Sequence, residues 1–333
     1  HLLGWDYPAD RNAEGVGLFG LADQIEALRS DATATILVDN GDFLQGTLLG
    51  DWHVTEWRRG IARAHPMITA MDALGYDVIT LGNHEFDYGL DYLGAVCDTA
   101  EIPIVSANLH GPNGVAPPLA SVRPWIVIDR SIEDEQGTPI PLRIGVFGVM
   151  PPQTMDWNRR TMHGQAEVSG IVETAAKTVT ELRDAGADLG GARSHSVIAE
   201  PDDPTSGENA SLCLADIAGI DAIIAGHTHR VFPGPDHQGV SGTDSRAGLL
   251  AGTPAVMPGR WGSHLGQIDL ALRHRGPEGW SVTGQDVCVH QPPATGTETS
   301  RNRALPPDVL TAHERARAWG AHPVGHSEAA LHS

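Results

Sequence analysis

The sequence has few residues of several kinds, and each shortage excludes a class of protein. Only three of its 333 residues are cysteines, and they are far apart, so neither a disulfide framework nor a Cys-x-x-Cys zinc knuckle is expected. Lysine and arginine number 22 against 42 acidic residues, and the resulting net charge of −20 argues against a groove for nucleic acid. No apolar run approaches the roughly 20 residues of a membrane-spanning helix.

The rest of the composition is that of a folded globular protein. Hydrophobic residues make up 41% of the chain, and its length suffices for one large or two ordinary domains. The sequence begins at His1 without an initiator methionine or a signal-peptide pattern, so we interpret it as a mature chain or an excised fragment. Because lysine and arginine are few and scattered, bound metal cations are the expected source of positive charge for a small anionic substrate.

Helical and strand patterns alternate along the chain. Apolar residues at helical spacing predict helices at about 18–28, 66–74, 90–97, 171–182, 209–217 and 307–319. Apolar runs predict strands at about 35–38, 78–81, 102–108, 125–128, 142–150, 187–194, 220–225, 265–272 and 280–284. This alternation predicts an α/β layered architecture with parallel strands, in which ligands lie beyond the carboxyl ends of the strands.

Polar residues gather directly after four of these strand-like runs. Each cluster alone has an ordinary explanation, because Gly-Asp pairs form turns, isolated histidines are usually hydrogen-bonded, and roughly half of His-x-His pairs are incidental. Four strand ends on one rim that all offer Asp, Asn or His are nevertheless what a metal centre of mixed oxygen and nitrogen ligands requires. The candidate residues are Asp42 in NGDFLQG, Asn83, His84 and Asp87 in GNHEFD, His195 in SHS, and His227 and His229 in GHTH.

These motifs, in this order, resemble the calcineurin-like metallophosphoesterase superfamily. Longer stretches, among them LVDNGDFLQGTLLGD, ALGYDVITLGNHEFDYGLDYL and AGHTHRVFPGP, are similar to bacterial 2′,3′-cyclic-nucleotide 2′-phosphodiesterase/3′-nucleotidases, within the wider 5′-nucleotidase family. The resemblance covers nearly the whole chain. It implies a four-layer α/β/β/α sandwich of the metallophosphoesterase type, with a two-metal site on one rim.

The resemblance also implies which residues hold the metals. Asp42 would bridge two divalent ions, because its two carboxylate oxygens can each face one cation. Asn83, His195 and His227 would bind the same ion, and His229 would bind the other. Ligands of these kinds suit Mn, Zn, Fe or Co and leave the identity of the metals open.

By the same resemblance, His84 and Asp87 would form a catalytic pair rather than bind metal. His84 would donate a hydrogen bond to the phosphoryl group or the leaving oxygen, and Asp87 would orient the imidazole and favour its protonated form. A water or hydroxide held between the cations would attack phosphorus in line, without a covalent enzyme intermediate. Glu85, in the same motif, is expected to be a bystander, either solvent-facing or stabilising the loop.

The implied substrates are 2′,3′-cyclic nucleotides and 3′-nucleotides, hydrolysed during nucleotide catabolism in the periplasm or outside the cell. A 5′-nucleotidase or nucleotide-sugar hydrolase would share every catalytic residue and is the nearest alternative. Family members carry a further domain that grips the base between aromatic rings. We therefore expect residues 1–300 to form the catalytic domain, and residues 301–333 to form a linker helix, leading out of that domain, and the start of this C-terminal nucleotide-binding domain.

One family motif is missing from the sequence. The motif Asp-x-His, which supplies two ligands to the first metal, would lie before His1. In this chain the first metal would keep only Asp42 and His229, so that site is expected to be weakened or empty. A metal-binding domain without hydrolytic activity is accordingly the alternative from a different functional class.

A predicted strand also departs from the family pattern. Gly190, Gly191 and Arg193 interrupt the usual apolar run, so the strand is expected to be weak and His195 to be held less rigidly.

Some side chains near the rim receive no role. Ser263 and His264 resemble a family loop near the cleft, with a simple turn before a strand as an equal alternative. Trp52, Trp157 and Trp261 could line the cleft, although packing is the commoner role of tryptophan.

Overall fold

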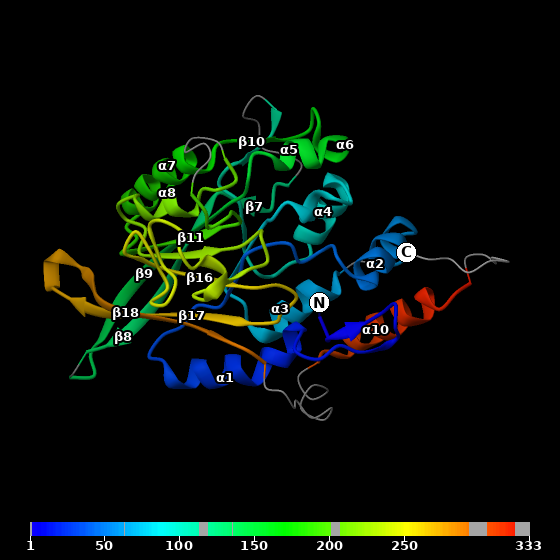
Figure 1. The fold of residues 1–333 in the computed structure, drawn as a ribbon, viewed down its shortest axis with the longest axis horizontal. Helices are drawn as coiled ribbons and strands as arrows, with labels where there is room; N and C mark the ends of the chain where they lie inside the picture. Colours follow the sequence, from blue (N-terminus) through cyan, green and yellow to red (C-terminus); the bar gives the residue numbers. More distant parts are fainter. Residues whose placement is uncertain are drawn as a thin grey trace.

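Two β-sheets packed face to face form the centre of the fold, and helices cover their outer faces (Figure 1). The computed structural model describes residues 2–62, 64–112, 119–134, 136–200, 207–292 and 305–323. The two sheets meet through a small apolar cluster centred on Val78 and Val105 of one sheet and Ile126 and Val146 of the other.

The smaller sheet has four strands, all parallel, in the order β3-β4-β5-β7. Its strands are β3 (Val38–Asp39), β4 (Val78–Thr80), β5 (Ile104–Val105) and β7 (Val122–Arg123). The fully buried apolar side chains of β4 and β5 explain why these short segments are central in the sheet.

The larger sheet has eight strands in the order β14-β15-β16-β12-β11-β9-β8, with β13 paired to β16. Four central strands run parallel, and β8 and β15 join them antiparallel. The strands are β8 (Trp125–Glu133), β9 (Pro139–Val149), β11 (Leu189–Ser194), β12 (Ala222–Ala225), β13 (Val231–Phe232), β14 (Thr243–Asp244), β15 (Leu249–Leu250) and β16 (Thr253–Pro258).

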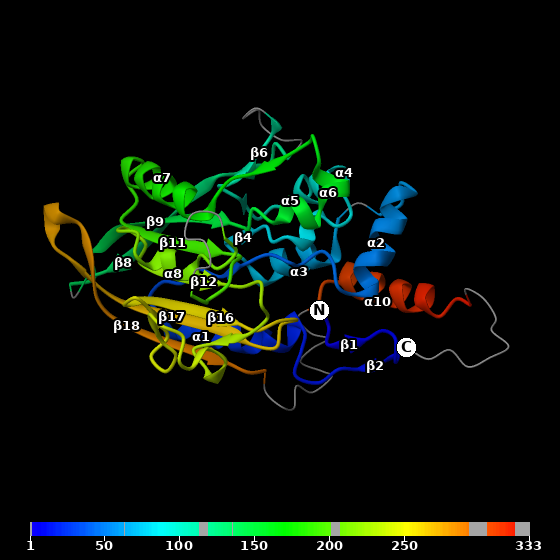
Figure 2. The same cartoon turned by 45° about the horizontal axis from the view of Figure 1, so that its top comes forward.

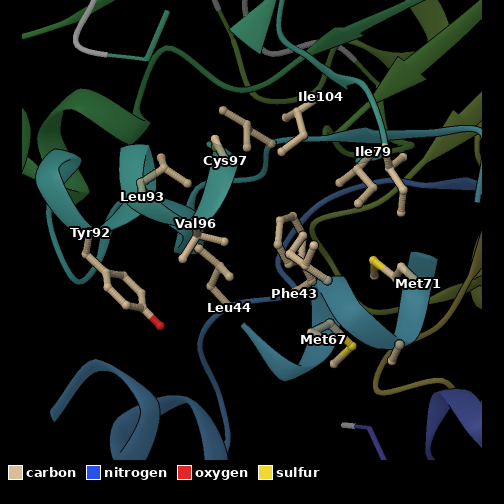
Figure 3. Packing of buried hydrophobic residues seen from close by; sticks show 14 of the residues in the cluster. Phe43, Leu44, Met67, Met71, Ile79, Tyr92, Leu93, Val96, Cys97 and Ile104 are labelled. Atoms are coloured by element: carbon tan, nitrogen blue, oxygen red, sulfur yellow. The ribbon is translucent and has the colours of Figure 1, made fainter. Parts of the chain in front are cut away.

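Helices α2 (Leu48–Arg58), α3 (Pro66–Leu74) and α4 (Leu90–Cys97) cover the smaller sheet and enclose the larger apolar core, part of which Figure 3 shows. Helices α7 (Ile171–Asp184) and α8 (Ser211–Ala215) cover the larger sheet. The buried residues of α7 recur every three or four positions, so this helix turns one apolar face to the sheet. The four-layer α/β/β/α sandwich predicted from the sequence is therefore confirmed.

Smaller elements surround the sandwich. Helix α1 (Ala22–Asp31) follows a short 3₁₀ turn, and α5 (Thr154–Trp157) and α6 (Arg159–Met162) are single turns. Three two-stranded antiparallel pairs join β1 (Trp5–Asp6) to β2 (Arg11–Asn12), β6 (Leu109–His110) to β10 (Glu167–Val168), and β17 (Leu265–His274) to β18 (Trp280–His290).

One helix was not predicted from the sequence, and one expectation about a strand was wrong. Helix α2 was not predicted, because polar residues interrupt the apolar spacing of its buried face, which includes Leu49, Trp52 and Val54. The run around Arg193 forms a complete six-residue strand, β11, paired in parallel with β9 and β12. Glycine at position 190 allows close packing rather than weakening the strand, since a Cβ there would lie 2.1 Å from the carbonyl oxygen of Gly219.

Helix α10 (Pro307–Gly320) packs against α2 and α3 in both views (Figures 1 and 2), whereas the sequence predicted a helix that leads out of the domain. Its buried residues Val309, Ala312 and Ala316 belong to the larger apolar core. A helix with so much buried surface contributes to the stability of the sandwich.

Replacing Val309 with alanine should lower the free energy of unfolding by about 2 kcal/mol, because it removes two buried methyl groups and leaves a small cavity. Val309 is fully buried, whereas Arg315 on the same helix is exposed. Urea unfolding of Val309→Ala, with Arg315→Ala as the matched control, measures the difference. Equal stability of the two variants would show that α10 does not contribute to the core.

None of the helices in the described ranges is both long and apolar enough to cross a bilayer. All three cysteines are free.

Candidate metal centre and catalytic site

The predicted site residues follow the carboxyl ends of strands from both sheets. In the smaller sheet β3 ends at Asp39 and β4 at Thr80, and in the larger sheet β11 ends at Ser194 and β12 at Ala225. The loops after these four strands carry every predicted ligand, and contacts between the loops of the two sheets define a common rim.

Asp42 links the loops of the two sheets. Its Oδ1 accepts a hydrogen bond from the backbone N–H of His84 at 3.0 Å, and its Oδ2 lies 3.0 Å from Nε2 of His195. Position 82 must be glycine, because a Cβ there would lie 2.3 Å from Oδ1 of Asp42 and 2.7 Å from Cε1 of His195. Burial opposes ionisation of Asp42, but the neighbouring His195 outweighs it and lowers the pKa of the carboxyl.

Three predicted ligands have left-handed backbone conformations that residues other than glycine rarely adopt. The φ angle is 63° at Asp42, 74° at His227 and 61° at His229. Such conformations cost on the order of 1–3 kcal/mol each and are concentrated at functional sites, where the surrounding structure enforces them. The strain is therefore located where the sequence predicted metal ligands.

His195 is oriented as a metal-binding histidine would be. The side chain is only 3% exposed, and its Nδ1–H donates to the backbone carbonyl of Asn40 at 2.7 Å. Nε2 therefore faces Oδ2 of Asp42 at 3.0 Å, and the two side chains form a buried ion pair when the imidazole is protonated. Burial acts to lower the pKa of His195, but Asp42 raises it to about 9. A divalent cation bound between Nε2 and the carboxylate would take the place of the Nε2 proton, which is the usual arrangement for a metal-binding histidine whose other ring N–H is held by a backbone carbonyl.

His227 and Asn83 form a second pair on the rim. Nδ1 of His227 lies 3.0 Å from Oδ1 of Asn83, and Nε2 lies 3.2 Å from Oε2 of Glu208. The Trp157 ring stacks on His227, with centroids 5.2 Å apart and an interplanar angle of 19°. The neighbouring Asn158 amide donates to the backbone carbonyl of Asn83 at 2.9 Å. Burial lowers the pKa of His227 and so favours the neutral form that binds metal.

Glu208 and Asn158 were not identified from the sequence. Both lie in irregular segments with no periodic pattern, so nothing local distinguishes them from solvent-exposed polar residues. Their positions become informative only when the fold brings the segments to the rim.

The predicted ligands form pairs rather than a closed cage. In the part of the chain that the structure describes, no group of three or more His, Cys, Asp or Glu side chains is arranged to hold a metal ion. Asp42 is paired with His195 and Asn83 with His227, and the rings of His195 and His227 lie 5.5 Å apart. Burial lowers the pKa of His229, which follows on the same loop.

His84 and Asp87 are in contact as predicted. Nδ1 of His84 lies 2.8 Å from Oδ2 of Asp87, and the hydrogen bond to Asp87 raises the pKa of the imidazole. The His84 side chain is 44% exposed, so its outer edge is open to a ligand. With Nδ1 engaged by Asp87, Nε2 is the atom available to substrate.

Glu85 stabilises the loop, which is one of the two roles expected of it, and it does not face solvent. The side chain is completely buried, and its carboxylate accepts four backbone N–H groups. Three of these come from Asp42, Phe43 and Leu44, and the fourth comes from Gly82, at distances of 2.7 to 3.2 Å. Burial and the charge of Asp42 raise the pKa of Glu85 to about 7, whereas the N–H donors act to lower it.

The tryptophans considered for the cleft have different environments. Trp52 is buried in the larger core, but Trp157 and Trp261 are 48% and 45% exposed. Ser263 and His264 contact each other, with 2.8 Å between Oγ and Nδ1. Within the described ranges, neither side chain forms a hydrogen bond to a predicted metal ligand.

Comparison with known proteins relates this rim to one family. Residues 15–231 match the family model described as calcineurin-like phosphoesterase. The chain is 39% identical, over 98% of its length, to a 2′,3′-cyclic-nucleotide 2′-phosphodiesterase/3′-nucleotidase of Yersinia enterocolitica. It is 35% identical, over its whole length, to the protein of the same name in Salmonella typhimurium.

A solved structure has the same fold. The crystal structure of the calcineurin-like phosphoesterase YfkN from Bacillus subtilis superimposes with a TM-score of 0.88 at 33% identity, covering 96% of this chain and 95% of that one. The chain spans about half the length of the Yersinia and Salmonella relatives, 50% and 51%. From the family match and the shared fold, the chain belongs to the calcineurin-like phosphoesterase family.

Proposed function

We propose that this chain is the catalytic part of a metal-dependent hydrolase that cleaves 2′,3′-cyclic nucleotides and 3′-nucleotides. The observation that carries the proposal is the buried His195, whose Nε2 faces the carboxylate of Asp42 at the ends of two sheets. The relatives that are 35–39% identical over nearly the whole chain bear the name of this activity and support the choice of substrates.

The proposed cofactors are two divalent ions, Mn, Zn, Fe or Co. Asn83, His195 and His227 would hold one of them together with Asp42, and His229 would hold the other with Asp42. When bound, such ions activate water for attack on phosphorus and neutralise the charge that develops there. Asp42, anchored by the N–H of His84, keeps its second oxygen toward His195.

The catalytic pair would act on the phosphoryl group directly. The Nε2–H of His84 would donate a hydrogen bond to an oxygen of the phosphoryl group or to the leaving oxygen, and Asp87 would hold the ring in place through Nδ1. Glu85 would act indirectly, because its four hydrogen bonds fix the loop that carries Asp42 against the loop that carries Asn83 and His84.

The domain organisation and the location of the protein are proposed from the length of the relatives and from the resemblance of this chain to them. The relatives are about twice as long as this chain, so we propose that residues 1–300 form the catalytic domain and that residues 301–333, whose helix α10 packs on that domain, lead into and begin a nucleotide-binding domain. We also propose a periplasmic or extracellular location and a role in nucleotide catabolism. The negative net charge of −20 disfavours nucleic acid as a substrate.

Metal removal tests the proposed function. The full-length protein supplied with Mn²⁺ should hydrolyse bis(p-nitrophenyl) phosphate, a substrate that needs no base recognition, and dialysis against EDTA should reduce turnover to background until Mn²⁺ is restored. Circular dichroism before and after EDTA checks that the fold persists. Turnover that survives EDTA would refute a metal-dependent mechanism.

Substrate comparison tests the narrower assignment. The full-length protein should cleave 2′,3′-cyclic AMP and 3′-AMP faster than 5′-AMP or a nucleotide sugar. The reverse order would favour a 5′-nucleotidase or nucleotide-sugar hydrolase. Mn²⁺ binding without turnover of any of these substrates would favour a metal-binding domain that lacks hydrolytic activity.

A further inference from the structure

We propose that Glu208 is a positioning residue for His227: its carboxylate accepts the Nε2–H and so directs the Nδ1 lone pair toward Asn83, where a cation binds. Glu208 follows neither a predicted motif nor a strand end, and nothing in the sequence assigned it a role. The inference rests on the proposed function, because that proposal supplies the cation.

Both nitrogens of His227 face acceptors. Nε2 lies 3.2 Å from Oε2 of Glu208, and Nδ1 lies 3.0 Å from Oδ1 of Asn83. A neutral imidazole carries one N–H, whereas a carboxylate and an amide oxygen both offer only lone pairs. One of the two contacts must therefore lack a proton. The carboxylate is the stronger acceptor, so the proton belongs on Nε2 and the lone pair on Nδ1.

The contact between Nδ1 and Asn83 then brings together two electron-donating atoms. His195 and Asp42 form the neighbouring pair on the rim, with Nε2 lying 3.0 Å from a carboxylate oxygen. A cation bound at Nδ1 and the amide oxygen would remove the repulsion between these two atoms. A histidine whose outer nitrogen donates to a carboxylate is also the usual arrangement for a metal-binding imidazole.

Glu208 is fixed to the segment that carries His195. Its backbone carbonyl accepts from the N–H of Val197 at 2.9 Å, and Val197 lies two residues after His195 and is buried. Trp157 covers one face of the His227 ring, with the two rings nearly parallel. The imidazole is therefore held at its outer edge by Glu208 and on its face by Trp157, which leaves the Nδ1 edge as the one directed at the rim.

The side chain of Glu208 is 40% exposed, so removing it leaves no buried charge and little lost packing. The expected effect is on metal affinity rather than on folding. Loss of an outer partner of a metal-binding histidine typically weakens metal affinity by about 10–100-fold.

Calorimetric titration of the metal-free protein with Mn²⁺ alone tests the inference. Glu208→Ala should bind Mn²⁺ about 10–100-fold more weakly than the wild type, while Glu208→Gln should stay within about threefold, because the amide oxygen still accepts the Nε2–H. Glu173→Ala, which removes an exposed carboxylate on α7, is the matched control and should bind as the wild type does. Thermal unfolding of each variant checks that the fold is retained.

Each outcome has one meaning. A wild-type protein that binds no Mn²⁺ would overturn the proposed function itself. Wild-type affinity in Glu208→Ala, with Mn²⁺ binding intact, would overturn only the role of Glu208. Equal loss of affinity in the Gln and Ala variants would make Glu208 a direct ligand and would likewise overturn the positioning role.

Discussion

Glu85→Ala is expected to lower the free energy of unfolding by about 4 kcal/mol, because it leaves four N–H groups without an acceptor and each such group costs about 1–3 kcal/mol when buried. The four groups belong to Asp42, Phe43, Leu44 and Gly82, which lie in two loops separated by some forty positions in the sequence. Removing the carboxylate therefore disconnects the loop that carries Asp42 from the loop that carries Asn83 and His84, and turnover should fall together with stability.

Urea unfolding of the metal-free protein measures the change without interference from bound ions. Glu85→Gln should have an intermediate stability, because the amide keeps one acceptor oxygen but turns an NH₂ group toward two of the donors. Glu101→Ala removes an exposed carboxylate nearby in the sequence and serves as the control. A loss below about 1 kcal/mol in Glu85→Ala would mean that water replaces the carboxylate at little cost, and the proposed link between the loops would be abandoned.

The example of Glu85 shows what the sequence could not reveal. Its motif, GNHEFD, was identified correctly as part of the rim, yet the side chain acts on backbone groups of another loop. Hydrogen bonds from a side chain to distant backbone N–H groups produce no periodic sequence pattern, so the sequence left open whether Glu85 faces solvent or stabilises the loop. Glu208 was missed for the same reason, since its contact with His227 depends on how an irregular segment folds over the rim.

The strand ends, by contrast, were predictable. Asp42, Asn83, His195 and His227 each follow an apolar run, and parallel strands in open α/β sheets bring such positions to one edge. The error at β11 arose because glycine was expected to weaken the strand. At position 190 glycine is required because the carbonyl of Gly219 lies too close for any side chain. Local propensity is a poor guide where neighbouring backbone determines the residue.

His84→Ala is expected to lower kcat by about 10²–10⁴-fold with little change in KM, because the imidazole is proposed to donate a hydrogen bond that matters most in the transition state. The backbone N–H of residue 84, which holds Oδ1 of Asp42 at 3.0 Å, is retained in this variant. Loss of activity can therefore be separated from loss of the metal site. Asp87→Asn should give a smaller loss, since the ring keeps a hydrogen-bonding partner but loses the neighbouring negative charge.

Steady-state kinetics with bis(p-nitrophenyl) phosphate, together with Mn²⁺ titration of each variant, distinguishes the possible roles. Unchanged Mn²⁺ affinity with reduced kcat is the expected result for His84→Ala. His163→Ala, which removes an exposed histidine elsewhere, controls for the loss of a surface imidazole. If His84→Ala retained the wild-type kcat, the catalytic assignment would be wrong. If its Mn²⁺ affinity fell as far as its kcat, His84 would act through the metal site instead of on the substrate.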